Sequence, residues 1–180
     1  MAWRPTAAAC AAASAGAALA LLLARRWRGR ADVFHVLRLE PGQDVKMELL
    51  EYVARQGLRA ACVVSSVGSL TAARLRLANA AAGEPEPILE RKEKFEVCSL
   101  IGTLERSEAE GKASCHLHVA LADGEGQMVG GHVMPGCRVN VTLEIVLLEL
   151  RRWSFRRVFD PRTGYKELVP TQLLPVGFWA

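Results

Sequence analysis

The sequence lacks the cysteine patterns of a disulfide framework or of a zinc ribbon. It contains five cysteines, an odd number, and no two of them form a Cys-x-x-Cys pair. Cys62 and Cys98 lie in apolar segments and are expected to fill core positions as small hydrophobic side chains. Cys115 and Cys137 flank a group of histidines, so each is a candidate metal ligand, although Cys115 should point to the opposite strand face from its histidine neighbours.

Several motifs of nucleotide and hydrolase chemistry are also missing. There is no Gly-x-x-x-x-Gly-Lys-Ser/Thr phosphate loop, no Gly-x-Gly-x-x-Gly fingerprint and no Gly-x-Ser-x-Gly nucleophile elbow. An AT-hook is incomplete, because its Arg28-Gly29-Arg30 core is followed by Ala31 instead of the usual proline. The sequence therefore gives no support to NTPase, Rossmann or α/β-hydrolase chemistry, nor to minor-groove binding by a hook.

Acidic residues are absent from residues 1–31, which contain five arginines. These arginines account for more than the whole net charge of +4, so the rest of the chain is slightly acidic. A domain that binds nucleic acid normally carries a clear excess of Lys and Arg on one face, so this balance argues against nucleic acid as a partner. The strongest local cluster of positive charge is at residues 151–157, where arginines alternate with aromatic residues as in a phosphate-binding strip. We interpret it instead as a solvated terminal strand whose arginine stems cover apolar surface.

Residues 7–24 form an uncharged run of 18 residues that is rich in alanine and at the short end of what crosses a bilayer. Four arginines follow this run and outnumber the single Arg4 before it. The positive-inside rule then predicts a membrane anchor with the domain on the cytosolic side. A mitochondrial presequence and a cleaved secretory signal are the alternatives, and the unpaired cysteines count against secretion. Residues 1–31 are thus predicted to be an anchoring or targeting leader.

The rest of the chain has the apolar and polar alternation of a mainly antiparallel β protein. A turn is expected at residues 66–69, between the second and third of the predicted strands. The strands are predicted at 33–40, 59–65, 70–79, 94–105, 116–122, 127–134 and 138–150.

One helix is clear from the sequence. Asp44 is expected to cap a helix that runs to about Gln56 and stops at Gly57. The chain is therefore predicted to hold a single compact α/β domain of the α+β type, with a mainly antiparallel sheet and one or two helices. This domain spans residues 32–170 and is followed by a tail at 171–180.

Three of the only four histidines, His116, His118 and His132, lie within 17 residues. Residues two apart in a strand point to the same face, so the first two should present their imidazoles side by side. The turn at 124–126 should fold the next strand back and bring His132 next to them. Three neutral imidazoles with an open fourth position are the ligand set of a catalytic or substrate-binding zinc. Spacing alone also allows three unrelated histidines.

Glu144 is the candidate catalytic residue. It lies on the strand after the histidines, with the same parity as Thr142, and could orient a metal ligand or act as a general base at the metal. The alternative is an edge or surface carboxylate. The fourth histidine, His35, lies on an apolar strand face and is expected to be a core or interface group.

Several motifs, taken in order, resemble the plants-and-prokaryotes-conserved (PPC) domain in its prokaryotic form. They are V-G-S-L-T at 67–71, F-E-V-C-S-L-I-G-T at 95–103, H-L-H at 116–118, V-G-G-H at 129–132, Gly136-Cys137 and D-P-R-T-G-Y-K-E-L at 160–168. The resemblance covers roughly residues 33–168. It implies a compact α/β fold with a largely antiparallel sheet, a homotrimer, and a bound metal, zinc, with ligands at His116, His118 and His132. It supplies no reaction.

Plant members of this family pair the domain with AT-hooks and bind A·T-rich DNA, and they lack this histidine set. The present chain has the histidines and no intact hook, which argues against transferring DNA binding to it. The leading hypothesis is a trimeric, zinc-binding protein that binds or acts on an unidentified small molecule. The alternative is a non-enzymatic oligomerisation or DNA-associated module in which the metal only stiffens the fold.

Overall fold

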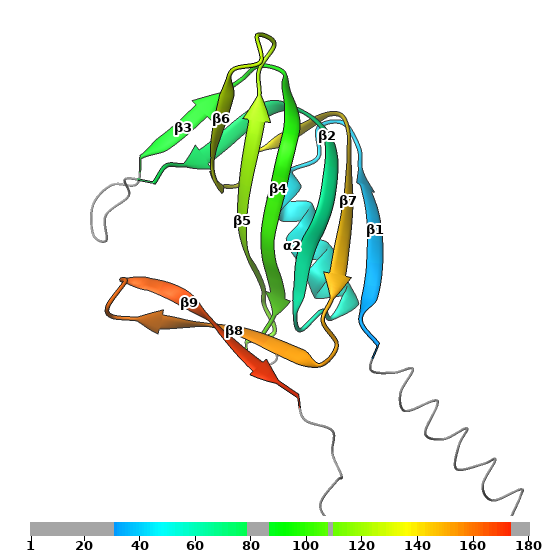
Figure 1. Ribbon diagram of the computed structural model, residues 1–180, viewed down its shortest axis with the longest axis vertical. Helices are drawn as coiled ribbons and strands as arrows, with labels where there is room; N and C mark the ends of the chain where they lie inside the picture. Colours follow the sequence, from blue (N-terminus) through cyan, green and yellow to red (C-terminus); the bar gives the residue numbers. More distant parts are fainter. Residues whose placement is uncertain (1–30, 79–86, 108–109, 174–180) are drawn as a thin grey trace, which may run out of the picture. The chain divides into compact units, whose positions relative to one another are not determined.

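The computed structural model describes residues 31–78, 87–107 and 110–173. The chain divides into two compact units, residues 1–31 and 32–180. The described helix and strands all lie in the second unit, whose main feature is a large antiparallel sheet with a helix against one face (Figure 1).

The helix in the described part of the chain, α2, spans Val45–Gln56. The carboxylate of Asp44 accepts hydrogen bonds from the backbone N–H groups of Lys46 and Met47, each at 3.1 Å, and satisfies two donors of the first turn. Gly57 ends the helix in the left-handed conformation, with φ 67°. The predicted helix, its cap and its stop are therefore confirmed.

The described strands form a seven-stranded sheet and a two-stranded sheet, and their pairings are antiparallel. In the large sheet the order is β1-β7-β2-β4-β5-β6, with β3 paired to β2 and a further pairing between β2 and β6. The arrangement confirms the predicted α+β fold class. The bounds are β1 Val33–Leu39, β2 Ala61–Arg76, β3 Ile88–Arg91, β4 Phe95–Arg106, β5 Ala113–Ala122, β6 Met128–Val133, β7 Arg138–Glu149, β8 Trp153–Asp160 and β9 Tyr165–Gln172.

Strand β2 is continuous over 16 residues, so the turn predicted at 66–69 is wrong. Its pairing with β7 is irregular, and one irregularity lies between Gly68 and Leu70. Gly68 has φ 150°, and a Cβ at this position would lie 2.1 Å from the carbonyl oxygen of Thr142. The glycine therefore permits a close approach of two backbones within a sheet instead of a reversal of the chain.

Helix α2 covers one face of the large sheet. The opposite face, which the helix does not cover, is called the open face. Leu49 and Val53 of the helix are fully buried in one core with sheet residues such as Leu117 and Leu147. Side chains of alternate residues in each strand point away from this core. Four large apolar side chains of the open face are between 59% and 76% exposed: Phe34, Val36, Val67 and Ile101.

The hairpin of β8 and β9 packs on the open face near one end of β4 (Figure 1). Arg157 on β8 donates hydrogen bonds to Thr103 Oγ1 at 2.6 Å and to Glu105 Oε1 at 3.1 Å. Phe155, on the same strand, is 6% exposed. The terminal strand predicted at 151–157 is thus corrected: it opens a hairpin, and part of it is turned inward against the sheet.

The prediction of a membrane anchor is also corrected. The same correction applies to the location derived from it, which was a domain tethered on the cytosolic side of a membrane. Among the residues that the structure describes, no helix is long and apolar enough to cross a bilayer. The run at 7–24, on which the anchor and the mitochondrial and secretory alternatives were based, lies outside the described residues.

Candidate metal centre

Strands β5 and β6 bring the three histidines together on the open face. His118 and His132 are register partners across this antiparallel pair, and His116 lies two residues earlier on β5. The centroids of the three imidazole rings are between 5.0 and 5.6 Å apart. One ligand atom from each ring lies within 4.8 Å of the other two. The three rings therefore form one compact cluster.

The local sequence explains how β6 reaches this position. Asp123 accepts hydrogen bonds from the backbone of Glu125 and Gln127 and closes the turn between β5 and β6. A Cβ at Gly131 would lie 2.6 Å from the carbonyl oxygen of Arg76, and one at Gly130 would be similarly close to β5. The two glycines thus let β6 fit between β5 and the end of β2.

The donor atoms of the cluster fit a shared cation. The Nε2 atoms of His116 and His118 are 3.1 Å apart. Within the described residues, the buried Nδ1 of His132 has no hydrogen-bond partner, and such orphaned atoms are rare in folded proteins. A tetrahedral zinc with Zn–N bonds of about 2.0–2.1 Å would hold two nitrogens about 3.3–3.4 Å apart. The Nε2 pair of His116 and His118 is therefore close to the spacing of zinc ligands, and three imidazoles are a donor set that zinc accepts.

The surroundings keep two of the imidazoles neutral. Burial, followed by the charges of Arg76 and Lys46, lowers the pKa of His132 from 6.5 to about 4. Burial is also the main cause that lowers the pKa of His116, with smaller contributions from His118 and Arg157. A neutral imidazole has the free lone pair that a metal needs, so both rings are in the binding form at physiological pH.

The other candidate ligands lie outside the cluster. Cys137 is 1% exposed, and its thiol donates to the carbonyl oxygen of Arg74 at 3.4 Å. Cys115 packs against the core, and burial raises the pKa of its thiol to about 11. His35 Nδ1 lies 2.9 Å from the hydroxyl of Tyr52 at the other side of the sheet, in agreement with a core or interface role.

The structure does not bring Glu144 to the histidines. Glu144 is an exposed residue of β7, where it is the register partner of Arg38 on β1 and of Val67 on β2. It shares the open face with the cluster, but β2 and β4 separate β7 from β5. At about 4.8 Å per strand this is about 14 Å, too far for the Glu144 side chain to reach the three histidines within one chain.

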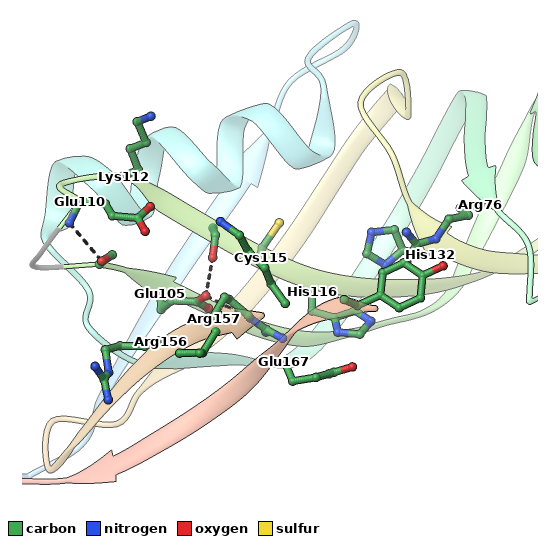
Figure 2. Close-up of a pocket in the computed structure, with 15 residues that line it drawn as sticks. Arg76, Glu105, Glu110, Lys112, Cys115, His116, His132, Arg156, Arg157 and Glu167 are labelled. Carbon is green, nitrogen blue, oxygen red and sulfur yellow. Dashed lines mark hydrogen bonds and ion pairs between the residues drawn. The ribbon is translucent and has the colours of Figure 1, made fainter. Parts of the chain in front are cut away.

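A pocket of about 530 Å³ adjoins the cluster, with His116 and His132 in its wall. The sheet supplies one side of this pocket, and the β8–β9 hairpin supplies the other through Arg156, Arg157 and Tyr165, among others. Figure 2 shows residues from both sides around the histidines. The pocket lies within the usual size range of small-molecule sites.

The hairpin residues of the pocket could not be assigned from the sequence. Arg157 lies in the basic strip that we interpreted as a solvated strand. Tyr165 lies in one of the motifs that carry the family resemblance, and no function was assigned to it. The sequence feature that could have indicated a hairpin here is the D-P-R-T-G turn at 160–164, which separates two strand-like runs.

Two solved structures share this fold at appreciable sequence identity. A hypothetical protein from Salmonella enterica is 41% identical, with a TM-score of 0.69, over 81% of this chain and 97% of that chain. A metal-containing protein from Archaeoglobus fulgidus is 27% identical, with a TM-score of 0.66, over 76% of this chain and 93% of that chain.

Two curated relatives are similar over part of their length. The bifunctional protein GlmU of a Synechococcus strain is 44% identical over 132 residues, which are 73% of this chain and 20% of that protein. AT-hook motif nuclear-localized protein 13 of Arabidopsis thaliana is 36% identical over 101 residues, which are 55% of this chain and 22% of that protein. The chain spans about a fifth of the length of these relatives.

The model of one protein family covers the domain that holds the three histidines. It is the Plants and Prokaryotes Conserved (PCC, or PPC) domain, and the match runs over residues 28–151. The matched residues include all of the large sheet and end before the β8–β9 hairpin. The chain therefore belongs to the Plants and Prokaryotes Conserved domain family.

Proposed function

We propose that the chain binds zinc through His116, His118 and His132, and that a small molecule is bound beside the ion in the adjoining pocket. The observation that carries this proposal is the grouping of three imidazole ligand atoms within 4.8 Å, where one buried nitrogen has no hydrogen-bond partner among the described residues. Zinc held by three histidines supplies a Lewis acid with an open coordination position.

The chain's own residues hold the ion and shape the space next to it. Strand pairing fixes His118 opposite His132, so little conformational entropy is lost when the three rings take up an ion. The hairpin encloses the pocket on the side away from the sheet. The name of the Archaeoglobus relative, which is 27% identical, agrees with a metal in this fold.

The direct test is metal analysis of the purified chain, followed by a ligand screen with and without a chelator. A ligand-binding metal predicts about one zinc per chain and ligands that are lost with the chelator, while the fold persists. A purely structural metal predicts a sharp loss of thermal stability on chelation and no ligand that depends on the ion. A chain without bound zinc at saturating supply contradicts the proposal.

The open face supports self-association, and a homotrimer is the assembly we propose. Phe34, Val36, Val67 and Ile101 expose large apolar side chains on one face of the sheet. Exposed apolar groups that gather on one face typically mark an interaction surface. Ile101 is the register partner of His118, so this surface reaches the edge of the metal centre.

A DNA-associated module is the second candidate function. Its support is the 36% identity to an AT-hook motif nuclear-localized protein, which weighs against the expectation, drawn from charge, that nucleic acid is not a partner. The test is binding of the full chain and of the fragment from Asp32 onward to A·T-rich duplex DNA at physiological salt. Tight binding by the fragment would favour this candidate, and its absence would exclude it for the domain.

A further inference from the structure

Arg157 is held in the pocket wall by two residues of the sheet. Its Nε donates to Glu105 Oε1 at 3.1 Å and its Nη2 donates to Thr103 Oγ1 at 2.6 Å. The side chains of Arg157 and Glu105 are 12% and 1% exposed, so the ion pair is almost completely removed from water. Ser114 donates a further hydrogen bond to the same carboxylate oxygen.

A buried ion pair of this kind adds little net free energy to the stability of the fold. Removing two charges from water costs about as much as their attraction returns, and apolar residues of similar size often stabilise a fold equally well. What the pair does provide is a guanidinium group in a fixed place. Two of its five N–H donors are used by described residues, which leaves three for a ligand.

The fixed guanidinium group lies next to the metal centre. Thr103, which binds it, is the register partner of His116 on the neighbouring strand. Register partners in an antiparallel pair have Cβ atoms about 5 Å apart and point to the same face. Figure 2 shows Arg157 and Glu105 side by side in the pocket, close to His116.

A second arginine lies on the other side of the cluster. Arg76 on β2 is the register partner of His132, and its guanidinium group lies over the ring of Tyr165, 5.3 Å from the ring centroid. Tyr165 belongs to β9, so the hairpin orients this arginine as well. The two arginines thus flank the three histidines, and both line the same pocket.

We infer that the pocket binds a small anion, whose carboxylate or phosphate group is held between Arg157, Arg76 and the metal ion on the three histidines. The inference deepens the proposed function and depends on it for the metal. Guanidinium groups bind both kinds of oxyanion through paired N–H donors, and a cation with an open position adds a further attraction. Overall, five cations and three carboxylates line the pocket.

The experiment uses the full chain loaded with zinc, with unbound zinc removed. Zinc content is measured first, so that failure of the metal site is seen separately from failure of the anion site. Calorimetric titration then measures the affinity of two probes, inorganic phosphate and malonate. Binding of phosphate alone assigns a phosphoryl ligand, binding of malonate alone assigns a carboxylate ligand, and binding of both assigns the shared oxyanion chemistry.

Two variants and a control test the arginines. Arg157→Lys keeps a positive partner for Glu105 but removes the paired donors, and Arg76→Gln removes the charge beside His132. The control is Arg91→Gln at the end of β3, where Arg91 forms an exposed ion pair with Glu93. We expect each pocket variant to weaken anion binding about 10- to 100-fold, while the control and all zinc contents stay unchanged.

Three results would overturn the inference. The first is zinc-loaded protein that binds neither probe. The second is a loss of affinity in the Arg91 control equal to that of the pocket variants. The third is an anion affinity that does not change when zinc is removed by a chelator. A chain that binds no zinc contradicts the proposed function itself, which the first measurement reveals before any anion is added.

Discussion

His118 and His132 face each other across the β5–β6 pair as register partners, so the proposed metal centre depends on the register of two strands. A shift of one residue in this pairing would move His132 to the other face of the sheet. The cluster is therefore a property of the folded sheet, and loss of register should remove the metal even when every histidine is still present.

Replacing a ligand should remove the metal without unfolding the chain. We expect His116→Ala to reduce zinc from about one per chain to background, because two imidazoles leave the ion without its third protein ligand. His116 is exposed, so the melting temperature of the metal-free protein should change little. His35→Ala is the matched control, and an equal loss of zinc in that variant would contradict the assignment. Elemental analysis and calorimetry measure both quantities.

Gly102 allows β4 and β5 to approach each other beside the histidine cluster. It has φ 144°, and a Cβ there would lie 1.9 Å from the carbonyl oxygen of His116. We expect Gly102→Ala to lower the free energy of unfolding by about 2 kcal/mol or more and to weaken zinc binding. Gly124→Ala, where a Cβ would meet nothing within 4 Å, should be close to neutral. Urea denaturation compares the two variants.

The buried ion pair should show strong coupling between its partners. Arg157→Met leaves the carboxylate of Glu105 buried without its charge partner, and we expect a loss of about 3–5 kcal/mol in the free energy of unfolding. Adding Glu105→Met should recover much of that loss. A double-mutant cycle measured by urea denaturation gives the coupling energy. Losses that simply add would mean that the two side chains do not act as a pair.

The thiols should differ sharply in reactivity. Burial raises the pKa of the Cys137 thiol, so at neutral pH the group stays protonated, and only a rise in pH would produce the reactive thiolate. Cys98 is exposed on β4, so the core position predicted for it from its apolar segment is wrong. We expect iodoacetamide at neutral pH to modify Cys98 and to leave Cys137 intact, as read by peptide mass spectrometry. Rapid modification of Cys137 in the folded protein would contradict its place in the core.

The open face should control self-association. Val67→Lys puts a charge on this face, and we expect it to shift the protein toward smaller species in light scattering after size-exclusion chromatography. Met47→Lys, on an exposed position of α2 behind the other face, is the control. Equal molar masses for the wild type and both variants would mean that the assembly does not use this face.

Local patterns predicted most of the elements and the histidine cluster. The helix from Asp44 to Gly57 depends on its own cap and stop, and the cluster depends on one hairpin, so both can be predicted from neighbouring residues. Glu144 has the expected parity but lies three strands away, because the order of strands in a sheet is decided by long-range packing. For the same reason the contact between Arg157 and Thr103 could not be predicted from local patterns.

The division of the pocket between two parts of the chain has a consequence for how its selectivity can change. The large sheet, within the matched family domain, carries every proposed metal ligand, and the β8–β9 hairpin beyond the match carries most of the facing wall. We therefore expect substitutions in the hairpin to change which ligand the proposed site binds, while the three proposed metal ligands on the sheet stay in place.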